Sequence, residues 1–235
     1  MSEPALVVVR HGATEWSQNG RHTSRTDLPL LPQGRESAAA LRQVFAGFTF
    51  GRVLCSPLLR ARETCELAGF GDRMVICQDL AEWDYGEYEG LTSAQIHELD
   101  PQWNLWRDGC PGGESPEQMA ERTDRVIALA VEDRDAVGEA RAAGAVGAAG
   151  TTGGARATGA RATGAVGPTG AVGANDGAGD TIAFAHGHVL RVLRARWVAW
   201  AAAGGERFAL APAGIAKLGH EHTTRVIERW NTTTL

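Results

Sequence analysis

An arginine, a histidine and a glycine follow a short apolar run near the N-terminus. Residues 6–9 are leucine and valines, a pattern typical of a buried strand, and Arg10, His11 and Gly12 come directly after them. A guanidinium binds phosphate oxygens through two donors, a neutral imidazole has a lone pair that can attack phosphorus, and glycine lets the backbone approach a ligand closely. The tripeptide suggests a phosphoryl-transfer site, although a strand that ends in a plain polar turn would give the same pattern.

Two further histidines follow another apolar run. His186, Gly187 and His188 come directly after residues 181–185. The carboxyl ends of parallel strands lie at one edge of an α/β sheet, where such sheets bind ligands. We therefore expect His11 and His186 to converge on one pocket, where helix N-termini would add backbone N–H donors for an anion.

Two further charged residues are expected at this edge. Ser56 and Pro57 favour a helix N-terminus, as N-cap and first residue, which places Arg60 near the start of that helix. Glu82 follows the third expected strand. Two arginines, two histidines and one glutamate together would form an anion pocket with a nucleophile and an acid.

The apolar patterns alternate between strands and helices. Strands are expected at residues 6–9, 52–55, 74–77, 181–185, 215–218 and 225–230, and helices at residues 32–46, 57–68, 93–99, 117–137 and 189 to about 200. Residues 13–32 are expected to be a loop. The alternation predicts an α/β fold with a mainly parallel sheet and helices on both of its faces.

Residues 138–180 differ from the rest of the chain in composition. They contain 13 of the 30 glycines and 14 alanines but no aromatic residue. Such a segment cannot bury enough apolar surface to order itself, so we expect a disordered, low-complexity insertion within a single domain formed by residues 1–137 and 181–235. A collagen-like interaction segment is the alternative, but the glycine triplet breaks at Gly153-Gly154 and Pro168 is the only proline there.

Composition and charge narrow the class of protein. Of the 235 residues 43% are hydrophobic, which is enough for a sizeable core. The formal net charge of −5 gives no electrostatic basis for binding nucleic acid or an anionic membrane. No stretch approaches the ~20 apolar residues of a membrane span, and no signal-peptide pattern precedes the first strand. The cysteines at positions 55, 65, 77 and 110 lack metal-site spacing, so we expect free thiols in a soluble, cytoplasmic protein.

Six motifs resemble, in the same order, those of the histidine phosphatase (phosphoglycerate mutase-like) superfamily. They are Arg10-His11-Gly12 with Thr14 and Trp16, the run from Gly20 to Leu30, Ser56-Pro57-Leu58-Leu59-Arg60-Ala61, Glu82-Trp83-Asp84-Tyr85-Gly86 with Glu89-Gly90, Pro111-Gly112-Gly113-Glu114-Ser115, and Ala185-His186-Gly187-His188. The resemblance covers most of the chain outside residues 138–180. The fourth and fifth motifs look most like a branch of acid and sugar phosphatases that includes sedoheptulose-bisphosphatase-like enzymes.

The resemblance implies a phosphatase that acts through a phosphohistidine, without a metal or other cofactor. His11 would be the nucleophile. Arg10, Arg60 and His186 would bind the phosphoryl oxygens, and Glu82 would protonate the leaving alcohol and then activate water. The residues implied to contact phosphate or substrate are Ser17, Thr23, Ser24, Tyr85, Gly187 and His188. The partner would be a small phosphorylated metabolite, and a homodimer is common among similar proteins.

Departures from the family pattern bear on the choice between phosphatase and mutase. Ala13 stands where the family usually has Glu or Gln, and Ser17 where mutases have Asn. Ser93 falls near the substrate-binding lysine of the mutases, and residues 105–113 lack their paired arginines. Without these cations a bisphosphorylated intermediate would be held weakly. The pattern favours a phosphatase, with a cofactor-dependent phosphoglycerate mutase as the alternative.

A metal-binding hydrolase is a more remote alternative. His186 and His188, like His220 and His222, have a spacing that can bind zinc or iron, but no cluster of further ligands accompanies either pair. Four other titratable residues are expected to be exposed on surface or loop: His22, His97, Glu87 and Glu89.

Overall fold

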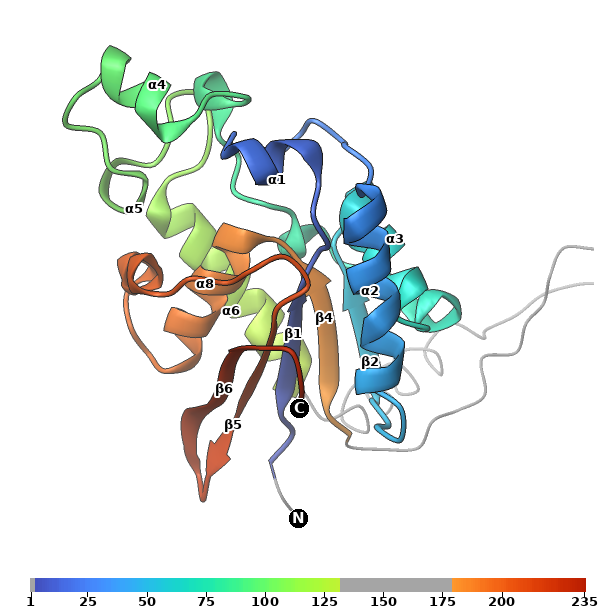
Figure 1. Cartoon of the computed structure of the whole chain (residues 1–235). Helices are drawn as coiled ribbons and strands as arrows, with labels where there is room; N and C mark the ends of the chain where they lie inside the picture. Colours follow the sequence, from blue (N-terminus) through green and yellow to red (C-terminus); the bar gives the residue numbers. More distant parts are fainter. Residues whose placement is uncertain (1–2, 132–178) are drawn as a thin grey trace, which may run out of the picture. The chain divides into compact units, whose positions relative to one another are not determined.

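The computed structural model describes residues 3–131 and 179–235. They form a six-stranded sheet with the strand order β3-β2-β4-β1-β5-β6, flanked by helices (Figure 1). The strands are β1 Leu6–Arg10, β2 Arg52–Cys55, β3 Met74–Ile76, β4 Thr181–Ala185, β5 Ile215–Glu221 and β6 Thr224–Thr232. Strands β1 to β4 pair in parallel, whereas β5 and β6 pair antiparallel. The α/β class with a mainly parallel sheet is confirmed.

The register of the central parallel strands brings their carboxyl ends level. Ala185, the last residue of β4, lies opposite Arg10, and the preceding Phe184 lies opposite the last residue of β2. The backbone amide of His11 donates to the Ala185 carbonyl at 2.9 Å, and that of Ser56 donates to the Phe184 carbonyl at 2.9 Å. The residues that follow β1, β2 and β4 therefore meet at one edge of the sheet.

Alternate residues of the strands belong to two apolar cores, one on each face of the sheet. Val7 and Val9 share a core with helices α2 and α3, whereas Leu6 and Val8 share the other with α6 and α8 (Figure 1). These four helices are α2 Pro32–Val44, α3 Leu59–Leu67, α6 Pro116–Val131 and α8 Gly187–Trp197. Burying one such Val or Leu side chain contributes about 1.5–3 kcal/mol. A slip of one residue would exchange the two cores, so the alternation fixes the register at the site edge.

Short elements complete the part of the chain that the structure describes. They are α1 Glu15–Asn19, α4 Ser93–Leu99, α5 Leu105–Asp108 and 3-10 helices at Gly71–Arg73, Gln78–Leu80, Gly86–Tyr88 and Ala202–Arg207. Among residues 3–131 and 179–235, none of the helices has the length and apolar character to cross a membrane.

Residues 13–32 are not an uninterrupted loop as predicted, because they contain α1. The Ser17 amide donates to the Thr14 hydroxyl at 3.2 Å, and the Thr14 amide donates to the Ser17 hydroxyl at 2.8 Å. Gly20 then ends the helix in the left-handed conformation, with φ of 74°. A helix of five residues is too short to show an apolar period, so only its capping residues could have revealed it.

The prediction that Ser56 and Pro57 begin the next helix is also wrong. Helix α3 begins at Leu59, and the N-cap residue Leu58 makes no side-chain cap. The Ser56 hydroxyl lies instead 2.7 Å from Nε2 of His186. Because Ser56 is hydrogen-bonded to β4 through its amide, its side chain belongs to the strand-edge cluster rather than to the helix.

Other boundaries differ by a few residues. Strands β5 and β6 extend beyond the predicted 215–218 and 225–230, since their hairpin pairs up to Glu221 and Thr224. The helix predicted over 117–137 is described up to Val131. The rest of that helix and residues 138–178 of the predicted insertion lie outside the described residues.

Candidate active site

The histidine at the end of β1 has a defined protonation state. His11 is buried, and its Nδ1 lies 2.7 Å from the Gly12 carbonyl oxygen, which can only accept a hydrogen bond. The proton therefore belongs on Nδ1, and Nε2 keeps its lone pair. Burial lowers the pKa of His11 well below its ordinary range, and the guanidinium groups of Arg10 and Arg60 lower it further. His11 is neutral at physiological pH, as a nucleophile must be.

Arg10, the neighbouring residue, offers an unused donor. Its Nη1 donates to the Leu210 carbonyl, but its buried Nε finds no hydrogen-bond partner among the described residues. Gly187 lies against this guanidinium, and a Cβ at that position would come within 3.4 Å of the Arg10 Cζ. A buried N–H without a partner costs free energy unless a ligand accepts from it. The arrangement therefore suits an anion.

Arg60 and His186 form a second, deeper pair. Nε of Arg60 donates to Nδ1 of His186 at 3.1 Å, so His186 carries its proton on Nε2 and donates it to Ser56. Burial and then the charge of Arg60 lower the pKa of His186 well below its ordinary range. The His186 ring lies 5.1 Å from that of His11, between centroids. This confirms the predicted convergence of the two strand ends.

Glu82 is held by backbone N–H groups. Its Oε1 accepts from the amides of Trp83 and Val189, both at 2.9 Å, and its Oε2 accepts from the amide of His188 at 3.0 Å. Two of these three donors belong to the first turn of α8, which directly follows His186. The N-terminus of a helix favours negative charge, so this placement of a carboxylate is electrostatically sound.

A cavity of about 410 Å³ is lined by three of these five residues. Arg10, His11 and Glu82 line it. Arg60 and His186 are buried and do not line it, so the prediction that His186 shares the pocket with His11 is wrong, although their rings lie close together. Of the residues predicted to contact phosphate or substrate, the following line the cavity: Ser17, Thr23, Tyr85, Gly187 and His188. Ser24 does not line it, and its hydroxyl donates to Glu89 at 2.6 Å.

Glu89 does not lie on an exposed side of the loop, as predicted with Glu87. Its carboxylate accepts from the amides of Ser24 and Thr26, each within 3.0 Å, and from the Ser24 hydroxyl. The carbonyls of Ser24 and Thr26 in turn accept from the Arg60 guanidinium. Glu89 therefore supports the loop that orients Arg60, whereas Glu87 is exposed.

The outer wall of the cavity contains two histidines that were predicted to lie on the surface, together with several residues for which the sequence predicted no individual role. His22 and His97 were expected on the surface, but both line the cavity. His22 is half-buried, and its burial lowers its pKa to about 4. The lining residues without a predicted role include Arg21, Trp103, Leu105, Trp106, Arg191 and Leu210. Among these residues, the sequence could have indicated Arg191, because it lies one helical turn after His188 on α8 and so on the same face of the helix.

The two histidine pairs do not form a metal centre in the described parts of the chain. Both ring nitrogens of His186 are engaged by Arg60 and Ser56, and Nδ1 of His188 lies 2.6 Å from the Tyr85 hydroxyl. No three or more His, Cys, Asp or Glu side chains group together as metal ligands among residues 3–131 and 179–235.

Comparison with known proteins gives the family. The model of the histidine phosphatase superfamily (branch 1) matches residues 6–142 and 148–233. An acid phosphatase from Mycobacterium tuberculosis is 35% identical over 222 residues, covering 94% of this chain and 88% of that protein. A sedoheptulose 1,7-bisphosphatase from Saccharomyces cerevisiae is 33% identical over 218 residues, covering 83% of this chain and 67% of that protein.

A solved structure supports the same assignment. The product of an open reading frame from Mycobacterium tuberculosis superposes with a TM-score of 0.74 at 33% identity, over 97% of both chains. The chain therefore belongs to branch 1 of the histidine phosphatase superfamily and is a phosphatase.

Proposed function

We propose that this chain hydrolyses a small phosphorylated metabolite in two steps, through a phosphohistidine at His11 and without a metal ion. The observation that carries the proposal is the state of His11, which is neutral, protonated on Nδ1 by its contact with the Gly12 carbonyl, and left with a lone pair on Nε2. The unpaired Nε of Arg10 and the carboxyl of Glu82 belong to the same cavity. A nucleophile, an anion donor and a proton carrier are thus within one site.

In the first step, Nε2 of His11 forms a bond to phosphorus while the bond from phosphorus to the ester oxygen breaks. Glu82, which enters this step as the neutral carboxylic acid, donates its proton to the departing alkoxide, which leaves as an alcohol. Arg10 binds the phosphoryl oxygens, and Arg60 and His186, which lie behind His11, are expected to stabilise the charge that develops on them.

In the second step, a water molecule attacks the phosphohistidine. Glu82, now a carboxylate, accepts a proton from the water as the new P–O bond forms and the P–N bond breaks. Inorganic phosphate leaves, and His11 returns to its neutral form with the proton still on Nδ1. Proton balance therefore needs Glu82 alone, and the Gly12 carbonyl keeps His11 in the same tautomer throughout.

The outer wall indicates the kind of substrate. Arg21 and Arg191 offer positive charge, while Trp103 and Trp106 offer apolar ring faces. This mixture suits a polyhydroxylated or anionic group beyond the phosphate that reacts. Two of the proteins that this chain resembles are an acid phosphatase and a sedoheptulose 1,7-bisphosphatase. We therefore propose a sugar phosphate or a similar metabolite as substrate.

The test is phosphate release from a panel of substrates by the full chain. The panel contains p-nitrophenyl phosphate, 3-phosphoglycerate, fructose bisphosphate and sedoheptulose bisphosphate, each with and without EDTA, and with His11→Ala as control. We expect release that survives EDTA and disappears in the variant. Interconversion of 2- and 3-phosphoglycerate without release would identify a mutase instead. Release abolished by EDTA, or retained by His11→Ala, would contradict the proposed mechanism.

A further inference from the structure

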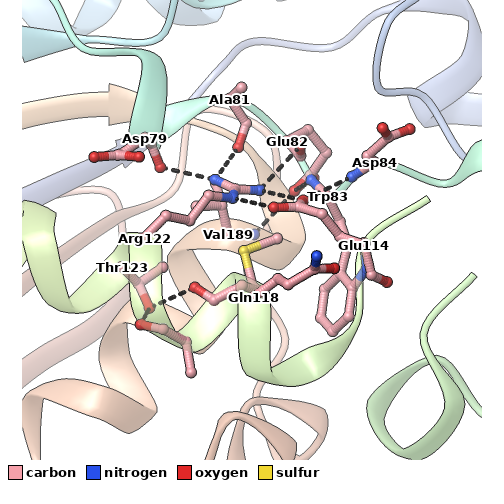
Figure 2. Close-up of polar contacts among 12 residues, drawn as sticks. Asp79, Ala81, Glu82, Trp83, Asp84, Glu114, Gln118, Arg122, Thr123 and Val189 are labelled. Carbon is pink, nitrogen blue, oxygen red and sulfur yellow. Dashed lines mark hydrogen bonds and ion pairs between the residues drawn. The ribbon is translucent and has the colours of Figure 1, made fainter.

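Behind Glu82, on the side of α6, a single arginine contacts the backbone on which Glu82 sits. Arg122 is 7% exposed, and its Nη1 donates to the carbonyls of Asp79 and Ala81, both at 2.7 Å (Figure 2). Its Nη2 donates to the carbonyl of Glu82 itself at 3.1 Å. One planar guanidinium thus contacts three carbonyls within four residues of a segment that has only one short 3-10 helix, Gln78–Leu80, to support it.

Glu114 holds this arginine from the other side. Its two carboxylate oxygens accept from Nε and Nη2 of Arg122 at 2.7 and 2.9 Å, the bidentate geometry that fixes a guanidinium plane. The same carboxylate accepts from the amide of Asp84 at 3.0 Å, and the Glu114 carbonyl accepts from the Trp83 indole at 3.0 Å (Figure 2). The backbone is therefore held both before and after Glu82.

The carboxylate and the backbone of Glu82 are held by different elements. The carboxylate is bound by amides of α8, whereas its backbone is bound through Arg122, which belongs to α6. Arg122 is ion-paired with Glu114, so the pair carries no net charge, and its hydrogen bonds act on the position of the Glu82 backbone. Misplacing a catalytic group by about 1 Å can reduce a rate by ~10²-fold.

We propose that Arg122, oriented by Glu114, is a positioning residue that places Glu82 for proton transfer to the leaving group. The inference rests on the proposed function, since it assigns Arg122 a part in the first step. Buried ion pairs contribute little net stability compared with apolar residues of similar size. Stability alone therefore does not account for the Arg122–Glu114 pair.

The test compares two leaving groups. A p-nitrophenolate leaves as a stabilised anion and needs little help from an acid, whereas the alkoxide of an alkyl phosphate such as glycerol 2-phosphate needs a proton. We measure kcat/KM, which reports the barrier to phosphoryl transfer from free enzyme and substrate. For Arg122→Met we expect kcat/KM to fall about 10²-fold with the alkyl substrate and less than about 5-fold with the aryl substrate.

Arg125→Met is the matched control. Arg125 is an exposed arginine one turn along on α6 that pairs with the side chain of Asp79, so it ties the same helix to the same segment without contacting the carbonyls near Glu82. We expect it to leave kcat/KM unchanged for both substrates. Glu114→Gln, a milder change, is expected to show the same selective loss as Arg122→Met but smaller, and it replaces Arg122→Met if that variant does not fold.

The outcomes are distinguishable. Equal losses with both leaving groups, or no loss with either, would show that Arg122 does not position Glu82. A selective loss in Arg125→Met would also contradict the inference, because any tie between α6 and this segment would then suffice. If the wild-type enzyme releases phosphate neither from these two substrates nor from the panel above, the proposed function itself fails, and the wild-type measurement therefore comes first.

Discussion

The inner and outer halves of the cavity are built in different ways. The inner half contains His11 at the end of a parallel strand, where backbone register and buried hydrogen bonds leave it one arrangement. His186, at the end of the neighbouring strand, is fixed in the same way but is buried outside the cavity lining. The outer half comes from separate segments, with His22 after α1, Trp103 between α4 and α5, and Arg191 on α8.

This difference separates the reaction from the choice of substrate. A strand-end residue cannot move without a shift of the sheet, whereas loop residues can be exchanged without disturbing β1 or β4. We therefore expect changes in the inner half to affect all substrates alike, and changes in the outer half to affect substrates selectively.

The largest effect is expected for His11→Asn. The amide keeps much of the shape of the ring but cannot form the phosphohistidine, so kcat/KM should fall by at least about 10⁴-fold with every substrate. Steady-state kinetics with aryl and sugar phosphates measures this. Loss of activity with only some substrates would show that His11 acts in substrate selection, as expected of the outer half of the cavity, rather than in the reaction itself.

Arg10→Met is expected to be the next most damaging. It removes the guanidinium that carries the unpaired Nε beside His11, and loss of one such charge-stabilising donor typically costs about 10²–10³-fold in kcat. The same kinetic panel should show similar losses for all substrates. If only KM changes, and kcat is preserved, Arg10 binds substrate without stabilising the transition state.

Arg191→Met tests the outer half directly. Arg191 stacks over Trp106, with its Cζ 4.6 Å from the ring centroid, and belongs to the cavity wall. We expect about a 5-fold rise in KM for substrates with a second anionic group and little change for p-nitrophenyl phosphate, since one charge pair at the protein surface is worth about 1 kcal/mol. Equal effects on both kinds of substrate would remove the distinction between the halves.

The smallest effect is a dependence of stability on pH. The pKa of His186 is lowered well below its ordinary range by burial, so the unfolded chain takes up a proton below about pH 6.5 while the folded chain does not. The free energy of unfolding is therefore unaffected by His186 above that pH and falls by up to about 1.4 kcal/mol per pH unit below it. Urea unfolding of wild type and His186→Gln at pH 7.5 and 5.5 should show a shallower loss in the variant. Equal slopes would contradict a neutral, buried His186.

The sequence was informative where chemistry and strand pattern coincide. The apolar runs at 6–9 and 181–185, each followed by histidine, were sufficient to predict that His11 and His186 meet, because parallel strands leave only one edge for both. Arg60 and Glu82 were expected at the same edge from their positions near a helix start and after the third strand, and the family motifs then implied their roles. The structure then supplied what no motif contains, namely the tautomer of His11 and the amides that hold Glu82.

The rest depended on contacts between segments far apart in the sequence. His22 looked like a surface residue because nothing near it in the chain indicates that Tyr85 and Trp103 pack against its ring. Glu89 looked exposed for the same reason, since its partner Ser24 lies 65 positions away. Local patterns predict elements, but burial in an irregular wall is decided by tertiary packing.

The most direct test of the account is to trap the phosphoenzyme. Glu82→Gln, mixed with p-nitrophenyl phosphate and quenched rapidly, should form the intermediate but hydrolyse it slowly, because this leaving group needs no proton whereas the attacking water needs a base. We expect an acid-labile phosphoryl group on His11 by tandem mass spectrometry, formed together with a burst of p-nitrophenol and absent in His11→Asn. A burst without phosphorylation, or a phosphoryl group on another residue, would contradict it.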